Sequence, residues 1–102
     1  GPAYVFYFCD AMMQAARGMG FNESEAELLV SQTFRGTVDL YNKSNFSCEE
    51  WIAKVSSKGG TTEQAIASFQ SANLASIVLQ ATRAAQKRSV ELADRLAGDS
   101  SR

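Results

Sequence analysis

The residues best suited to chemistry lie in one short segment, Ser57–Thr62, which reads Ser-Lys-Gly-Gly-Thr-Thr. Two adjacent glycines permit positive φ angles and let a ligand approach the backbone closely. The two threonines can cap a helix, and a helix N-terminus presents unpaired N–H groups together with the positive end of the helix dipole. The segment is therefore a candidate site for a carboxylate or a phosphate, but on composition alone an ordinary turn between helices is the more common explanation.

The sequence offers few residues for other kinds of binding or catalytic chemistry. Helical patterns flank the segment on both sides, so it is neither a P-loop nor a dinucleotide fingerprint, each of which follows a strand. Histidine is absent, which removes the commonest metal ligand and the usual base of a nucleophilic Ser or Cys. We expect no metal site. Cys9 and Cys48 lie outside any Cys-x-x-Cys motif, so reduced, mostly buried thiols are favoured over a disulfide.

The composition indicates one small domain. Ten basic and eleven acidic residues among 102 give a net charge of −1, and no run of one sign indicates a nucleic-acid or membrane partner. The apolar run at residues 3–9 is shorter than the ~20 residues that a membrane span requires. It also lacks the basic flank of a secretory signal. A cytoplasmic protein fragment is the resulting expectation.

The hydrophobic periodicity predicts an all-α fold with about five helices. The predicted ranges are residues 3–17, 23–41, 48–55, 62–70 and 74–97. Asn22, with Ser24 as the alternative, and Ser47 are the expected caps of the second and third helices. Gly36 lies inside the second helix, where we expect it to permit close approach of another helix. The polar residues 99–102 are expected to fray.

The predicted helices carry more apolar surface than a small monomer can bury. The first is apolar on nearly every face, and the fifth, at about 24 residues, is about 36 Å long. A chain of 102 residues has little core in which to place both. We therefore expect burial against a second copy, with a neighbouring domain as the alternative.

Four segments, taken in order, resemble pyrroline-5-carboxylate reductase, the last enzyme of proline biosynthesis. They are Gly1–Phe6 for Gly-Pro-Ala-Tyr-Val-Phe, Gln32-Thr33 with Gly36 for Gln-Thr-x-x-Gly, Val55–Thr62 for Val-Thr-Ser-Pro-Gly-Gly-Thr-Thr, and Arg88–Leu92 for Arg-Ser-x-Glu-Leu. Together they cover the chain to about Leu96. They match the C-terminal part of the enzyme only.

The resemblance implies an architecture. In that family an N-terminal Rossmann domain binds NAD(P)H, and the C-terminal helical domain interlocks with a second copy, with dimers often joining into rings. Residues 1–98 are then the dimerisation and substrate-binding domain, an interlocked homodimer of the 6-phosphogluconate dehydrogenase C-terminal-like type. The Rossmann domain is absent from the chain, because no strand–helix unit with Gly-x-Gly-x-x-Gly occurs.

The cofactor, NADP or NAD, would consequently bind mainly outside these residues, where the preference between the two is also set. Gly1, Pro2 and Ala3 match a family segment that passes close to the nicotinamide. We expect no cofactor on the fragment itself and no activity from it alone.

The resemblance also assigns roles in the reduction of the C=N bond of 1-pyrroline-5-carboxylate to L-proline. Ser57, with the backbone of the loop at Gly59, Gly60, Thr61 and Thr62, would hold the substrate carboxylate. The Thr62 hydroxyl would hydrogen-bond the ring nitrogen as the catalytic contact, with a plain N-cap as the alternative for this residue.

Two departures from the family pattern and one competing hypothesis accompany these roles. Lys58 replaces the usual proline, and Ala72-Asn73-Leu74 replaces a Gly-Gly-Leu type of turn. The competing hypothesis is a non-catalytic helical dimerisation or interaction module. Such a module would have no need of a glycine pair beside two hydroxyls at a helix start.

Overall fold

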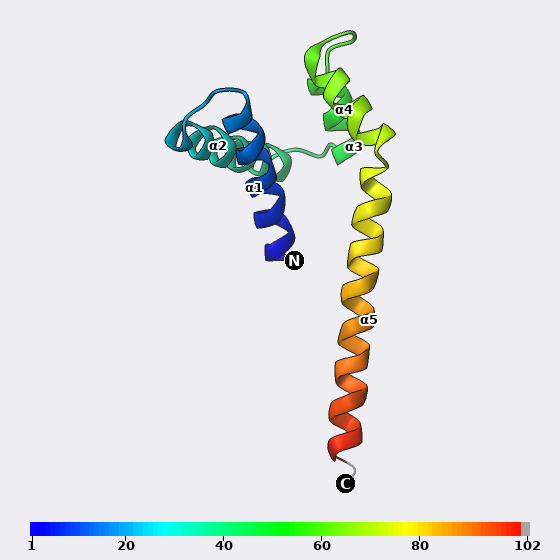
Figure 1. Ribbon diagram of the computed structural model, residues 1–102. Coiled ribbons are helices and arrows are strands. Elements are labelled where there is room, and N and C mark those ends of the chain that lie inside the picture. Colours follow the sequence, from blue (N-terminus) through cyan, green and yellow to red (C-terminus); the bar gives the residue numbers. More distant parts are fainter. Residues whose placement is uncertain (101–102) are drawn as a thin grey trace. The chain divides into compact units, whose positions relative to one another are not determined.

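The computed structural model describes residues 1–100, and within that range it contains five α-helices and no strand (Figure 1). The helices are α1 (Pro2–Gly18), α2 (Glu23–Asn42), α3 (Cys48–Val55), α4 (Thr61–Ser71) and α5 (Leu74–Ser100). The predicted all-α class is confirmed. The chain divides into two units, Gly1–Trp51 and Ile52–Arg102, with the boundary inside α3. Ser101 and Arg102, part of the predicted frayed tail, lie outside the described residues.

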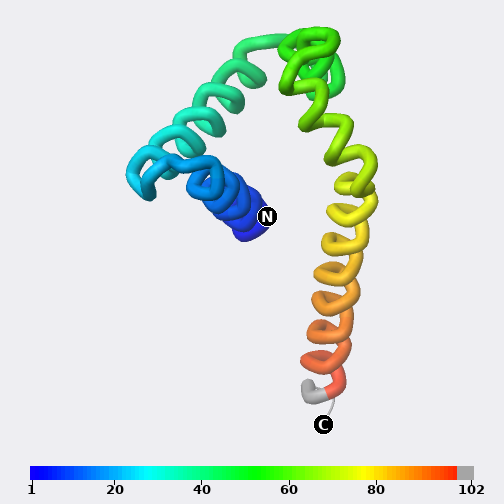
Figure 2. Tube along the Cα trace, turned by 45° about the horizontal axis from the view of Figure 1, so that its top comes forward, coloured from blue at the N-terminus to red at the C-terminus, as the bar shows by residue number. Residues whose placement is uncertain are grey.

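Helix α1 packs against α2 in the first unit (Figures 1 and 2). Pro2 occupies its first turn, where the missing N–H is not needed. The aromatic start of α1 would favour a strand by propensity, but it forms one helix with the strong helix formers that follow. The buried side chains of the unit are small: Ala16, Ala26 and Val30.

Most of the apolar surface of α1 and α2 remains exposed. Tyr7 of α1 is 81% exposed, and Phe8, 38% exposed, meets Phe34 edge-on at 6.0 Å between ring centroids. The expectation that α1 is buried on every side is therefore not met within one chain. Within the described residues no other helix approaches Gly36 either, because a Cβ built there has nothing within 4 Å apart from the backbone of its own helix.

Two capping boxes fix the starts of α2 and α3; the cap at Asn22 and the box at Ser47 were predicted, and the box at Asn22 was not. The Asn22 N–H donates to the Glu25 carboxylate at 2.9 Å, and the Glu25 N–H donates to the Asn22 side chain at 2.8 Å. Ser47 and Glu50 exchange the same pair of bonds at 3.0 and 3.1 Å. Each box satisfies N–H groups that a helix start would otherwise leave unpaired.

The single tryptophan anchors α3 to the loop before it. The indole N–H of Trp51 donates to the Ser44 hydroxyl at 2.8 Å, and its ring meets Phe46 edge-on at 5.4 Å. The cysteines are free thiols, with Cys9 partly buried and Cys48 exposed. Burial was thus wrongly expected for Cys48.

In the second unit, α4 contacts α5, and Asn73 joins them with a φ of 58°. This is the left-handed conformation common just after a helix end, and asparagine tolerates it better than most residues. Helix α5 is one continuous helix of 27 residues, about 40 Å long, and extends three residues past the predicted end (Figure 2). No side chain described in this unit is fully buried. Within residues 1–100, each helix is too short or too polar to cross a membrane.

Candidate functional site

The glycine loop, residues 56–60, connects α3 to α4. Helix α3 closes with the Ser56 N–H bonded to the Ile52 carbonyl at 3.0 Å. The chain then reverses through Gly59, whose φ is 74°, and Gly60, which has an extended backbone and is the N-cap of α4. A positive φ is readily adopted by glycine and strained for residues with a Cβ, so the turn depends on Gly59.

Gly60 is required for a different reason, which is space. Its N–H donates to the Ser57 carbonyl at 2.9 Å. A Cβ on Gly60 would overlap the Ser57 hydroxyl and lie 3.1 Å from the Ser57 carbonyl oxygen. The two residues are therefore packed against each other, and the Ser57 hydroxyl lies beside Gly60 at the start of α4.

The start of α4 offers unpaired backbone donors. The first N–H to bond within the helix is that of Gln64, which reaches the Gly60 carbonyl at 3.3 Å. The N–H groups of Thr61, Thr62 and Glu63, which precede that of Gln64, have no intrahelical acceptor. Because the Gly60 N–H is paired inside the loop, these three are the unpaired donors at the helix start, the kind of group that can bind an anion.

The predicted capping by threonine is wrong. Gly60 holds the N-cap position, and no side chain caps α4. This also removes the alternative role of Thr62 as a plain N-cap. Among the described residues neither threonine hydroxyl has a hydrogen-bond partner, and both side chains are exposed, so each hydroxyl is available to a ligand.

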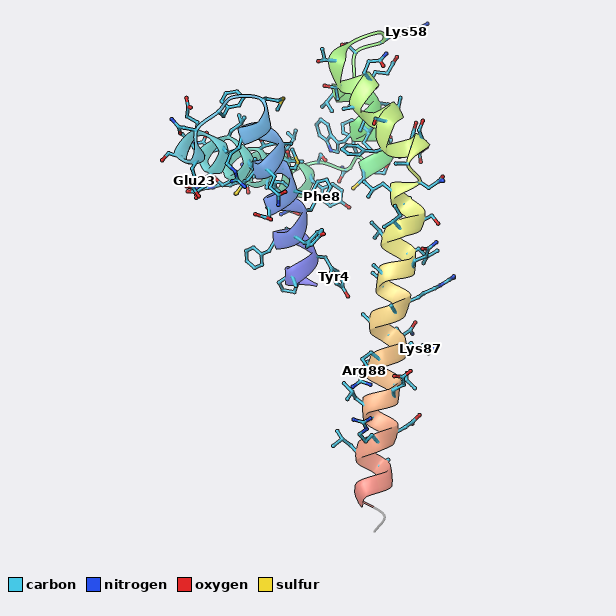
Figure 3. All side chains as sticks on the ribbon, in the orientation of Figure 1. Tyr4, Phe8, Glu23, Lys58, Lys87 and Arg88 are labelled. Carbon is cyan, nitrogen blue, oxygen red and sulfur yellow. The ribbon has the colours of Figure 1, made fainter. Side chains whose placement is uncertain are left out.

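Two charged side chains accompany the loop. Lys58 lies at its tip, exposed and directed outward (Figure 3). Glu63, in the first turn of α4, turns back so that its Oε1 accepts the Gly59 N–H at 3.2 Å. Sequence analysis missed this contact, although a glutamate three residues after the N-cap is a known signal for it.

The structure thus gathers five of the predicted site residues in the loop and the first turn of α4: Ser57, Gly59, Gly60, Thr61 and Thr62. The other three, Gly1, Pro2 and Ala3, belong to the first unit, where they begin α1 and are exposed. The Ser56 hydroxyl, which sequence analysis did not single out, is buried and has no partner in the described part of the chain.

An open apolar groove of about 760 Å³ also lies in the second unit. Its apolar lining consists mainly of Ile52, Ile66, Phe69, Leu74 and Val78. No residue of the glycine loop lines it, so the groove and the anion receptor are separate features. Across residues 1–100, no three Cys, Asp or Glu side chains gather in a way that could hold a metal ion.

The described residues thus form a helical fold in which a glycine turn leads into a helix start with unpaired N–H groups. A family model described as "Pyrroline-5-carboxylate reductase dimerisation" matches residues 1–92. The chain belongs to this family.

Individual relatives agree with the family match. Pyrroline-5-carboxylate reductase of Pseudomonas aeruginosa is 40% identical over 96 residues, which are 94% of this chain and 35% of that protein. The solved reductase of Coxiella burnetii has a TM-score of 0.86 at 39% identity, covering 90% of this chain and 34% of that one. The pyrroline carboxylate reductase of Plasmodium falciparum, solved with NADP bound, has a TM-score of 0.84 at 29% identity, over 87% and 35%. The chain spans about a third of the length of these relatives.

Proposed function

We propose that these residues are the substrate-binding and dimerisation part of a pyrroline-5-carboxylate reductase, which reduces 1-pyrroline-5-carboxylate to L-proline. The observation that carries the proposal is the start of α4, where three free N–H groups and two free threonine hydroxyls adjoin a loop built on Gly59 and Gly60. This loop coincides with the family's glycine–threonine segment. A dimerisation module without a substrate would have no use for such a receptor.

The substrate carboxylate would bind at the N–H groups of Thr61 and Thr62. Both donors point out of the helix start, and the dipole of the 11-residue α4 favours a negative charge there. The Ser57 hydroxyl, held beside Gly60, would supply a further hydrogen bond. Fixing the carboxylate in this way orients the ring, and such orientation is a large part of what a site contributes to rate.

The Thr62 hydroxyl would hydrogen-bond the ring nitrogen. This nitrogen becomes an amine when the C=N bond is reduced, so a nearby hydroxyl can donate to it and steady the developing product. Thr62 is free for this role because Gly60, and not a threonine, is the N-cap. No ionisable side chain of the glycine loop other than Lys58 is a candidate proton donor, and Lys58 is directed outward (Figure 3).

The nicotinamide cofactor would be held mainly outside these residues, with Gly1, Pro2 and Ala3 near the nicotinamide. The dinucleotide-binding fold needs strands, a glycine-rich turn and a helix, and residues 1–100 contain no strand. We assign binding of the hydride donor, NADPH or NADH, to residues outside this chain. The chain alone is accordingly expected to be inactive.

Self-association is the second part of the proposal. In the first unit only three side chains are buried, and in the described second unit none is. Large apolar side chains such as Phe6, Tyr7 and Leu96 remain between 67% and 81% exposed. Exposed apolar surface of this extent marks an interaction face, and the family model is itself one of dimerisation. A second copy is the occupant that we propose, with rings of such dimers as a further level of assembly.

The test is oxidation of NADPH or NADH with 1-pyrroline-5-carboxylate by the natural gene product that carries these residues. We expect turnover, and a fall in kcat/KM of roughly 10-fold or more for Thr62→Ala. Thr37→Ala, at an exposed position of α2, is the matched control and should retain full activity. Full activity of Thr62→Ala would remove the role of the hydroxyl. A folded wild-type protein without turnover would favour the non-catalytic interaction module.

A further inference from the structure

Glu63 makes an unusual contact for a residue in the first turn of a helix. In the capping boxes of α2 and α3 the glutamate carboxylate accepts the N–H of the N-cap residue. In α4 the N–H of the N-cap, Gly60, is already bonded to Ser57. The Glu63 carboxylate reaches one residue further and accepts the Gly59 N–H at 3.2 Å. Both glycines of the loop are thereby tied by their N–H groups.

These two ties decide which donors remain for a ligand. Gly59 and Gly60 have their N–H groups paired inside the loop, so the unpaired donors are those of Thr61, Thr62 and Glu63. Without the tie from Glu63, Gly59 could leave its φ of 74°, because glycine populates many backbone conformations at similar cost. The unpaired N–H groups at the start of α4 would then be directed at a ligand only part of the time.

The residue before Gly59, Lys58, does not supply a second restraint on the Gly59 backbone. Lys58 precedes Gly59 and lacks the ring by which a proline would fix φ at that point. Its side chain is exposed and makes no contact that would restrain the turn (Figure 3). Apart from the bond between Gly60 and Ser57, the Glu63 carboxylate is the restraint on the loop within the described residues.

We propose that Glu63 is a positioning residue of the substrate site. Its carboxylate holds Gly59 in the left-handed conformation and so keeps the Thr61 and Thr62 N–H groups directed at the substrate carboxylate. Glu63 itself contacts no substrate atom. This inference rests on the proposed function, and it adds a residue that acts through the shape of the loop.

Two substitutions separate the hydrogen bond from the charge. Glu63→Gln keeps an acceptor oxygen at the same reach but removes the negative charge, whereas Glu63→Ala removes both. If the tie matters, the alanine variant is impaired and the glutamine variant is not. If the carboxylate instead repels the anionic substrate, both variants bind it more tightly than the wild type.

The experiment measures kcat and KM for 1-pyrroline-5-carboxylate in the natural gene product. We expect Glu63→Ala to raise KM by about three- to ten-fold, the range for loss of an ordinary hydrogen bond, with kcat within about twofold. Glu63→Gln should keep KM within about twofold of the wild type. Glu27→Ala, at an exposed glutamate of α2, is the charge-matched control. Amide hydrogen exchange of the glycine loop should accelerate in Glu63→Ala but not in Glu63→Gln.

Three results would contradict the positioning role of Glu63 or the proposed function. A KM that is unchanged or lower in Glu63→Ala, or equally raised in Glu63→Gln, would overturn the positioning role while leaving the proposed function intact. Unaltered hydrogen exchange in Glu63→Ala would overturn it as well. A wild-type protein that does not reduce the substrate would overturn the proposed function, and this inference with it.

Discussion

The Ser57 hydroxyl occupies the space that a side chain on Gly60 would need. A Cβ on Gly60 would overlap that oxygen, and the Ser57 carbonyl accepts the Gly60 N–H at 2.9 Å. Gly60, at the helix start, is thus needed because a side chain there would overlap Ser57. Gly59 is needed because its φ is positive. Two adjacent glycines are needed for two unrelated reasons.

This relationship predicts that Gly60→Ala is destabilising. Inserting a methyl group against a fixed neighbour typically costs about 1–3 kcal/mol, and here it must displace the Ser57 side chain. In a Ser57→Ala background the cost should be smaller, because the oxygen is gone and only the Cβ and carbonyl remain. Denaturant unfolding of the four proteins of this double-mutant cycle measures the coupling. Equal costs in both backgrounds would contradict the predicted overlap.

The capping box of α3 predicts a dependence on pH. The hydrogen bond from the Ser47 N–H, followed by that with the Ser47 side chain, lowers the pKa of Glu50 below its usual 4.5. A lowered pKa means that the ionised carboxylate stabilises the folded state. This contribution is complete above pH 4.5 and is lost as the pH falls through the lowered value.

Trp51 is the only tryptophan of the chain and lies in α3, so its fluorescence reports this helix. We expect Glu50→Gln to unfold more easily than the wild type at neutral pH and to approach it as the pH falls. Glu49→Gln removes a neighbouring charge without the bonds to Ser47 and is the control. A difference between wild type and Glu50→Gln that is constant with pH would refute the prediction.

Gly36 yields a prediction about association. In an isolated helix, replacing an interior glycine by alanine stabilises by about 1 kcal/mol, and nothing in this chain lies within 4 Å of the Cβ position. We infer that a second copy makes the close approach that the chain itself does not. Gly36→Ala should therefore weaken dimerisation, measured by sedimentation over a range of protein concentrations. A variant with tighter or unchanged association would place Gly36 outside the interface.

Much of the fold followed from the sequence. The caps at Asn22 and Ser47 were identified because capping boxes are local patterns with a fixed spacing. The helix ends also agreed within three residues, since glycines and the left-handed Asn73 interrupt the hydrophobic periodicity. Burial was predicted less well from the sequence, because the periodicity shows which face of a helix is apolar but not what covers that face. For α1 and Gly36 the predicted neighbours are not found within the chain.

The site was predicted as a segment but not in detail. Glycine and threonine types indicated a helix start that binds anions, and the structure places a helix start there. Which residue would cap it was misjudged, because a threonine and a glycine can both take the N-cap position and the choice depends on how the loop reverses. The reach of Glu63 to Gly59 depends on the same geometry.

The scarcity of buried side chains has a consequence for the protein inside a cell. Among residues 1–98 the buried side chains are Ala16, Ala26 and Val30, so this part of the protein has little core of its own while it lacks a partner. Newly made copies would depend on chaperones until they meet a partner, and unpaired copies would be open to proteases. The level of the proposed dimer would then rise more steeply than the level of synthesis, because pairing depends on the square of the concentration of free subunits.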